Sequence, residues 1–235
     1  MNNGLELEAE VKVNEKDGDF IYRLYNKRAQ FNRGYNALKS IKAEVAGAKD
    51  LIYLTMKKGG GILLDLGSVL REGCLNIPKG IYPPRGGILL LRESLILESV
   101  EAVKEATCSH EGRTEFYVSD QLTKRYLREA KQKSGKAILL KSHPPLPTLS
   151  FGNDERTIFL FEDLADEIGR FLNGRGKNEM LFYFDNEDTI NKHDKAYANQ
   201  LWLNINGTTA RLTGNFLHLG NKECFIRGFV KEKAS

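Results

Sequence analysis

Residues 5–13, with the sequence LELEAEVKV, decide the first element of the fold. Apolar residues stand at every second position and charged residues, mostly glutamates, stand between them. Side chains alternate between two faces in a β-strand, so this segment has one apolar and one polar face. A turn cluster at 14–18 follows, and 20–25 returns with a strand-like pattern. The N-terminal part of the chain therefore predicts a β-hairpin that packs on a core by one face.

Beyond the hairpin, helix-like and strand-like patterns alternate along the chain. Apolar residues at three- and four-residue spacing predict helices at 35–46, 94–106, 121–133 and 163–172. Short apolar runs predict strands at 51–56, 62–66, 88–91, 115–118, 137–140, 157–161 and 180–184. Residues 201–230 contain Asn-Gly and Gly-Asn turns between apolar runs. We predict a mixed α/β (α+β) fold, in which a mixed sheet carries helices in the N-terminal two thirds and ends in an antiparallel meander.

Proline-rich and glycine-rich stretches mark the predicted boundaries. The segment 142–150, SHPPLPTLS, contains three prolines and predicts a linker or loop between residues 1–141 and 151–235. The alternative is that both parts form one domain. Residues 73–87 contain further prolines and glycines and predict a surface loop.

Composition limits the class of protein. The chain has 235 residues, of which 41% are hydrophobic and 28% charged, so it can bury a core. No apolar run approaches the roughly 18 residues of a membrane-spanning helix. Three widely spaced cysteines and the absence of a Cys-x-x-Cys motif argue against a disulfide framework or a thiolate zinc site. These features predict a cytoplasmic protein in a reducing compartment.

Charge is segregated along the chain, although the net charge is only +4. Residues 20–60 carry nine Lys or Arg against two acids, and residues 120–143 carry seven against two. Residues 153–188 carry ten acids against four bases. This distribution predicts a positive face and a separate acidic pocket.

The first basic segment, 22–35 (YRLYNKRAQFNRGY), interleaves cations with aromatic rings. Phosphates attract cations and bases stack on rings, so this pattern suits a nucleic-acid surface. The candidate binding residues are Arg23, Lys27, Arg28 and Arg33. The alternative is an ordinary segment whose rings are buried and whose bases are solvated.

The second basic segment is the predicted helix 121–133. Lys124, Arg128 and Lys131 recur at helical spacing and therefore share one face. Such a stripe could follow a phosphate backbone, and the alternative is a solubilising surface.

An acidic and histidine-containing region supplies candidate catalytic residues. Asp185 and Asp188 follow the predicted strand 180–184, and carboxylates at a strand end can hold Mg²⁺. His193 and His218 could serve as metal ligand and general base. Their spacing with an intervening asparagine is similar to that of HNH nucleases, but the strand pattern and the His-Asp order differ from that motif, so no family is assigned. The alternative is an acidic turn without a metal.

Together these residues lead to the hypothesis of a nucleic-acid-binding and processing protein. In its enzymatic form it is a Mg²⁺-dependent nuclease of restriction or defence type, with Asp185, His193 and His218 as catalytic residues and Asp185 and Asp188 as metal ligands. The first alternative is a DNA- or RNA-binding protein without catalysis. The second is a structural or interaction component, such as a viral or phage assembly protein, and a homo-oligomer is compatible with each.

Overall fold

The computed structural model describes residues 4–59, 67–81, 86–108, 116–214 and 224–234. The predicted N-terminal hairpin is confirmed: β1 (Glu6–Glu15) and β2 (Gly18–Ala29) pair antiparallel, with Val11 opposite Tyr22. From Ala9 onward the alternating side chains Ala9, Val11 and Val13 of β1 are buried, whereas Leu7, before the register shift in this pair of strands, is 54% exposed. The period-two pattern thus places one face of the hairpin on the core.

The described residues form one twelve-stranded sheet, and the mixed α/β class is confirmed. Its main path runs in the order β1-β2-β12-β4-β10-β11-β9-β8, and β5 and β7 continue from the side of β4. Most neighbours are antiparallel, but β9 pairs parallel with β11, and β12 pairs parallel with β4. The remaining strands are β3 (Glu44–Val45), β4 (Ser68–Ile77), β5 (Gly87–Leu91), β6 (Phe116–Tyr117), β7 (Ala137–Leu140), β8 (Leu146–Pro147), β9 (Glu179–Tyr183), β10 (Tyr197–Asn206), β11 (Thr209–Thr213) and β12 (Cys224–Lys233).

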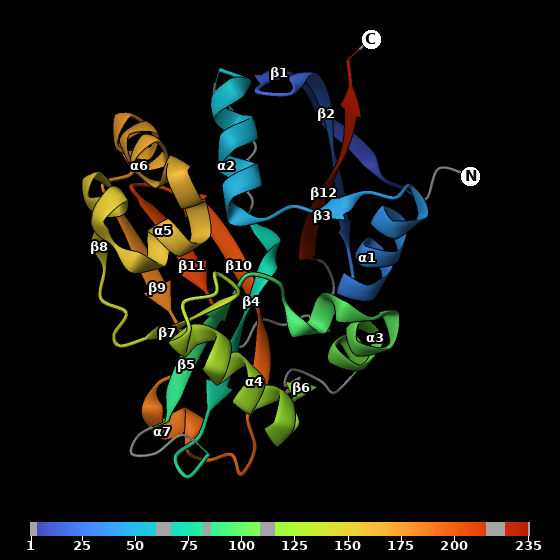
Figure 1. Ribbon diagram of the computed structural model, residues 1–235. Coiled ribbons are helices and arrows are strands. Elements are labelled where there is room, and N and C mark those ends of the chain that lie inside the picture. Colours follow the sequence, from blue (N-terminus) through green and yellow to red (C-terminus); the bar gives the residue numbers. More distant parts are fainter. Residues whose placement is uncertain (1–3, 60–66, 82–85, 109–115, 215–223, 235) are drawn as a thin grey trace.

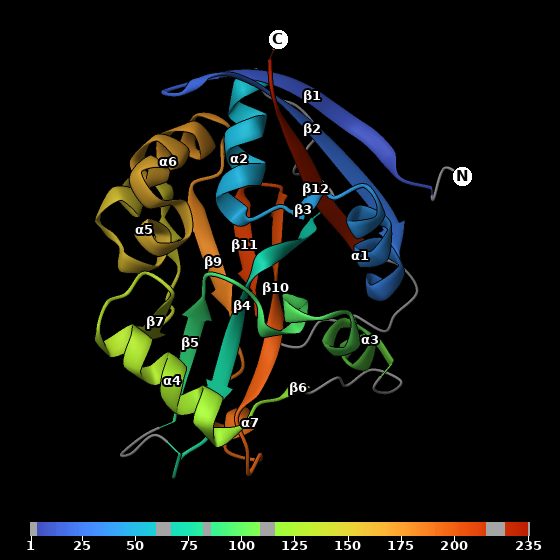
Figure 2. The same ribbon diagram turned by 45° about the vertical axis from the view of Figure 1, so that its right-hand side comes forward.

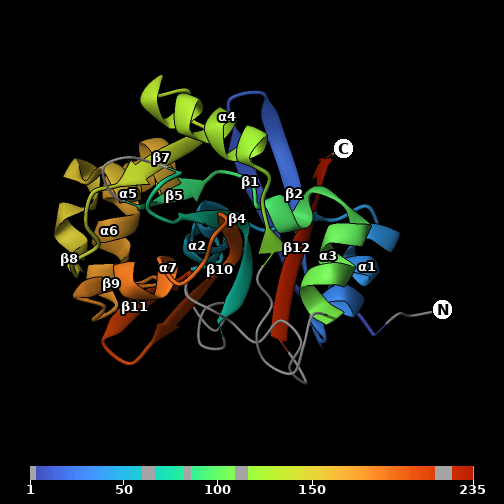
Figure 3. The ribbon, with the colours of Figure 1, turned by 90° about the horizontal axis from the view of Figure 1, so that it is seen from below.

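Helices cover both faces of the sheet, as the views in Figures 1, 2 and 3 show. One core contains side chains of α2, α5 and α6, and the other contains side chains of α1 and α3, with α4 packed at its margin. Figure 3 shows α5 and α6 on one side of β4 and β10 and α1 and α3 on the other. The α-helices are α1 (Phe31–Ser40), α2 (Ala48–Lys57), α3 (Val100–Cys108), α4 (Asp120–Lys131), α5 (Glu155–Phe161), α6 (Ala165–Gly174) and α7 (Glu187–Ile190). Short 3-10 helices lie at Leu95–Glu98 (η1), Thr148–Asn153 (η2) and Glu162–Leu164 (η3).

The central strand β4 explains why the sheet is covered on both faces. Leu70 and Cys74 belong to one core, and Val69 and Leu75 belong to the other. A strand buried on both faces reads as a nearly continuous apolar run instead of an alternating one. The predicted surface loop at 73–87 is therefore wrong for residues 73–77, which complete this strand.

Two short apolar runs form helices where strands were predicted. Residues 51–56 lie in α2, and residues 157–161 lie in α5. Periodicity cannot separate a buried helix from a buried strand over so few residues, and the capping groups decide the outcome. The Asp50 carboxylate accepts a hydrogen bond from the Gly47 N–H, and the Asp154 carboxylate accepts one from the Arg156 N–H. The predicted strand at 62–66 lies outside the described residues.

The C-terminal strands are antiparallel to their main neighbours, but they separate in space. β10 and β11 form the hairpin that the Asn-Gly turn predicts. β12 instead crosses the molecule to lie between β2 and β4. The segment 142–150 contains β8 and the start of η2. Among the described residues, no helix is long and apolar enough to cross a membrane.

A buried ion pair fastens β12 to the N-terminal hairpin. The Arg227 side chain is 1% exposed and makes two hydrogen bonds to the Glu8 carboxylate, at 2.7 and 3.0 Å. It also donates to the Gly67 carbonyl at 2.8 Å. A guanidinium buried this deeply needs all of these acceptors, so the hairpin, β12 and the start of β4 are held as a unit.

Candidate functional site

A groove lies between α4, β7 and α5, and we call it the basic groove. Its volume is about 780 Å³, which falls in the range of ligand sites. Its apolar lining includes Leu127, Ile138, Leu139, Ile158 and Phe159. Its cationic lining consists of Arg92, Arg128, Lys131, Lys133 and Lys141, with Glu155 as the single lining acid. The groove thus combines apolar walls with a strong positive charge.

The amphipathic sequence of α4 leaves this groove open. The Ser119 hydroxyl caps the helix by accepting a hydrogen bond from the Leu122 N–H at 3.3 Å. Within α4 only Thr123 is fully buried, while apolar residues such as Leu127 are only partly covered. From the other side, α5 contributes Ile158, which is 45% exposed. Neither helix therefore buries its apolar face completely, and the uncovered parts form the walls.

β7 lies between the two helices (Figure 2). Its residues Ile138 and Leu139 line the groove. Among the described residues, β7 pairs with β5 and with no other strand, so its second edge is unpaired. Ile138 packs toward the core beneath α5, and Leu139 toward the core beneath α4. Because both helices line the groove together with these two residues, the groove follows the free edge of β7.

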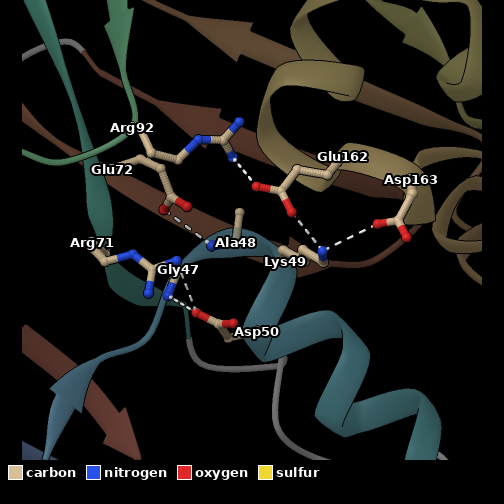
Figure 4. A network of polar contacts seen from close by, with 9 residues as sticks. All are labelled: Gly47, Ala48, Lys49, Asp50, Arg71, Glu72, Arg92, Glu162 and Asp163. Carbon is tan, nitrogen blue, oxygen red and sulfur yellow. Dashed lines mark hydrogen bonds and ion pairs between the residues drawn. The ribbon is translucent and has the colours of Figure 1, made fainter. Parts of the chain in front are cut away.

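Arg92 is held in place at the point where β5 ends. Its guanidinium lies over the Phe159 ring at 4.5 Å and contacts the Glu162 carboxylate at 3.2 Å. Glu162 also accepts a hydrogen bond from Lys49 at 2.6 Å (Figure 4). The backbone of Glu162 has φ 55° and ψ −133°, a conformation that costs a non-glycine residue free energy. Strain at a residue that orients a groove-lining arginine marks this network as a candidate functional feature.

The other half of this network fastens α2 to β4 (Figure 4). The Glu72 carboxyl is 1% exposed and accepts a hydrogen bond from the Ala48 N–H at 3.1 Å. Its second oxygen accepts none from the described residues. Burial away from water raises the pKa of Glu72 from 4.5 to about 7. A Cβ at position 47 would overlap the Glu72 carboxyl, so a larger residue in place of Gly47 would displace that side chain.

Two predicted catalytic residues, Asp185 and His193, both contact Tyr197. The Asp185 carboxylate accepts hydrogen bonds from the Tyr197 hydroxyl at 2.9 Å and from the Asn199 amide at 3.1 Å. The His193 ring lies 4.5 Å from the Tyr197 ring, and its Nδ1 lies 3.3 Å from the Tyr117 hydroxyl. Asp188 is exposed in the first turn of α7, and His218 lies outside the described residues.

These residues do not form a metal site within the described part of the chain. No three His, Cys, Asp or Glu side chains there gather closely enough to hold an ion. Asp185 is instead engaged by a tyrosine and an asparagine. The expected metal-binding character of Asp185 and Asp188 is therefore corrected: the first belongs to a hydrogen-bonded cluster and the second to a helix N-terminus.

Most cations of the first basic segment make contacts within the protein. Arg23 forms ion pairs with Glu10 and Glu232, and Lys27 donates to the Gly4 carbonyl at 3.0 Å. Arg28 lies over the Phe225 ring, and Arg33 is exposed on α1. Two of the segment's rings, Phe31 and Tyr35, are buried.

The second basic segment has a different environment. Arg128 and Lys131 line the basic groove, and Lys124 lines an adjoining hollow together with Arg128. The sequence pattern had missed Arg92, Ile158 and Phe159. Ile158 and Phe159 belong to the run 157–161, which was predicted as a strand. The sequence marks Arg92 only as a cation that follows the apolar run 88–91.

Comparison with known proteins identifies the fold. No family model and no curated protein matches the sequence. A solved structure from work on the accommodation of massive sequence variation in Nanoarchaeota by the C-type lectin fold matches with a TM-score of 0.62, over 97% of this chain and 100% of that one. The chain has the C-type lectin fold. Sequence identity is 11%, so the likeness concerns the fold alone.

The C-type lectin fold overturns the predicted function. The likeness is to a lectin-like fold and not to a nuclease, and the described residues contain no metal-ligand cluster. The nuclease hypothesis is wrong, and the comparisons give no support to the DNA- or RNA-binding and assembly alternatives. The physical reason is that charge segregation was read along the sequence without its partners in space: Arg23 pairs with Glu10 and Glu232, and Asp185 accepts hydrogen bonds from Tyr197 and Asn199.

Proposed function

We propose that this protein is a ligand-binding protein that takes negatively charged ligands with an apolar body into the basic groove. The observation that carries the proposal is the lining itself: five cations and one acid surround walls of aliphatic and aromatic side chains. Apolar walls with a few convergent polar groups are typical of ligand sites. The positive charge selects the sign of the ligand.

The C-type lectin fold supports the proposal as a scaffold. The matching structure concerns the accommodation of massive sequence variation by this fold, and only 11% of residues are identical between the two chains. A fold that tolerates such variation can carry different binding surfaces, so the ligand class follows from the surface of each chain.

The proposal is tested with anilinonaphthalene sulfonate, a dye that joins apolar rings to one anionic group and fluoresces in apolar sites. We expect saturable binding that weakens by at least about tenfold in the double variant Arg128→Glu/Lys131→Glu. The matched control is Lys104→Glu/Lys195→Glu, which changes the net charge equally at exposed positions outside the groove. Equal dye affinity in both double variants would contradict the proposal.

A further inference from the structure

We infer that the natural ligand is an extended segment of a partner protein in which acidic and aliphatic residues alternate, and that it binds as an added strand along the free edge of β7. This inference rests on the proposed function and names the class of its ligand. It follows from the edge, the walls and the charge of the basic groove.

The edge of β7 supplies the main-chain contacts. A strand at the edge of a sheet presents unpaired N–H and C=O groups that another extended chain can pair with. β7 pairs only with β5 among the described residues, and α4 and α5 stand on its two faces. The helices leave the edge reachable through the groove, because Ile138 and Leu139 are part of its lining.

The walls favour alternating side chains. Successive residues of an added strand point to opposite faces, one toward α4 and the next toward α5. On the α4 side, Leu127 can contact an aliphatic side chain of the added strand. On the α5 side, Ile158 can contact another. The Phe159 ring is already covered by the Arg92 guanidinium, so the groove offers aliphatic contact more than an aromatic stacking surface.

The charge favours several acidic groups over one. Four of the lining cations, Arg128, Lys131, Lys133 and Lys141, are exposed along the rim. A single anionic head group can reach only part of this set, whereas carboxylates spaced along a strand of about six residues, roughly 20 Å, can follow it. Arg92, oriented by Glu162, can offer paired N–H donors to one of these carboxylates.

The experiment measures fluorescence anisotropy of a labelled synthetic peptide that alternates glutamate with valine or leucine. Two control peptides are used: one of the same composition with acids and aliphatics in separate blocks, and one N-methylated on the residues whose N–H groups face β7. We expect the alternating peptide to bind and to displace anilinonaphthalene sulfonate, with each control peptide at least about tenfold weaker.

Two variants locate the peptide. Arg128→Glu/Lys131→Glu should weaken binding of the alternating peptide by at least about tenfold. Ile158→Asp should weaken it to the same extent, because it places a negative charge, like those of the peptide glutamates, on an exposed position of the groove wall. Thermal unfolding confirms that each variant is folded, and Lys104→Glu/Lys195→Glu should bind as the parent does. If the N-methylated peptide, or the peptide with acids and aliphatics in separate blocks, binds as tightly as the alternating peptide, strand addition is overturned. Dye binding in the groove without any peptide binding would overturn the inference alone, whereas the absence of dye binding would contradict the proposed function itself.

Discussion

Replacing Glu72 with glutamine tests the physical description of the network between α2 and β4. The glutamine keeps an oxygen that can accept the hydrogen bond from the Ala48 N–H but removes the ionisable group. Burial raises the pKa of this carboxyl from 4.5 to about 7. Between these values the folded chain keeps a proton on Glu72 that the unfolded chain has released. The free energy of unfolding of the parent protein therefore falls as the pH rises from 4.5 to 7.

The magnitude follows from the two pKa values. One pKa unit corresponds to about 1.4 kcal/mol, so full ionisation of Glu72 lowers the free energy of unfolding by about 3 kcal/mol. Glu72→Gln lacks this penalty. We expect its stability relative to the parent to increase by about 3 kcal/mol between pH 4.5 and about pH 8.

Urea unfolding across this pH range measures the difference. Glu105→Gln, at an exposed position of α3, is the matched control and should show no comparable pH-dependent gain. A difference between Glu72→Gln and the parent that stays constant from pH 4.5 to about pH 8 would refute the reasoning.

Three further substitutions test the fold by urea unfolding at constant pH. Lys42→Gly should raise the free energy of unfolding by about 0.5–1 kcal/mol, because exposed Lys42 has a left-handed φ of 57° after α1, and any loss of stability would count against this. Gly169→Ala should lower it by about 2 kcal/mol despite the better helix propensity of alanine, because the new Cβ would overlap the Thr148 carbonyl oxygen, and a neutral result would show that α6 can move away. Arg227→Ala should lower the free energy of unfolding by about 3–5 kcal/mol, because it leaves the Glu8 carboxylate without its buried partner. A loss below about 1 kcal/mol would show that this ion pair is exposed to solvent.

The parts of the fold that the sequence predicts are those governed by local pattern. The alternation at 5–13 and the turn at 14–18 specify the hairpin, and the apolar run at 137–140 gives β7. The amphipathic segment at 121–133 gives α4, whose N-terminus is capped by the Ser119 hydroxyl. In each case a neighbouring turn or cap agrees with the periodicity.

The errors occur where the apolar pattern is too short to decide or where tertiary contacts decide. Residues 51–56 and 157–161 are short apolar runs whose helical form depends on Asp50 and Asp154 at their starts. The position of β12 between β2 and β4 is a pairing across most of the chain, which no local pattern specifies.

The candidate site was predictable only in part. Two residues of the charged stripe predicted for α4, Arg128 and Lys131, line the basic groove. Besides Leu127 of α4 itself, its apolar walls come from α5 and β7, which are brought to α4 by the fold and not by sequence spacing. The same cations that suggested a phosphate backbone therefore border a groove with aliphatic walls.

The most direct test of the basic groove as the ligand site is methyl NMR of isoleucine-labelled protein during titration with anilinonaphthalene sulfonate. Ile138 and Ile158 line the groove, whereas Ile52 and Ile226 are fully buried elsewhere. The account predicts saturable shifts of the Ile138 and Ile158 methyl signals, with those of Ile52 and Ile226 nearly unchanged. Dye binding that leaves the Ile138 and Ile158 signals in place would contradict it.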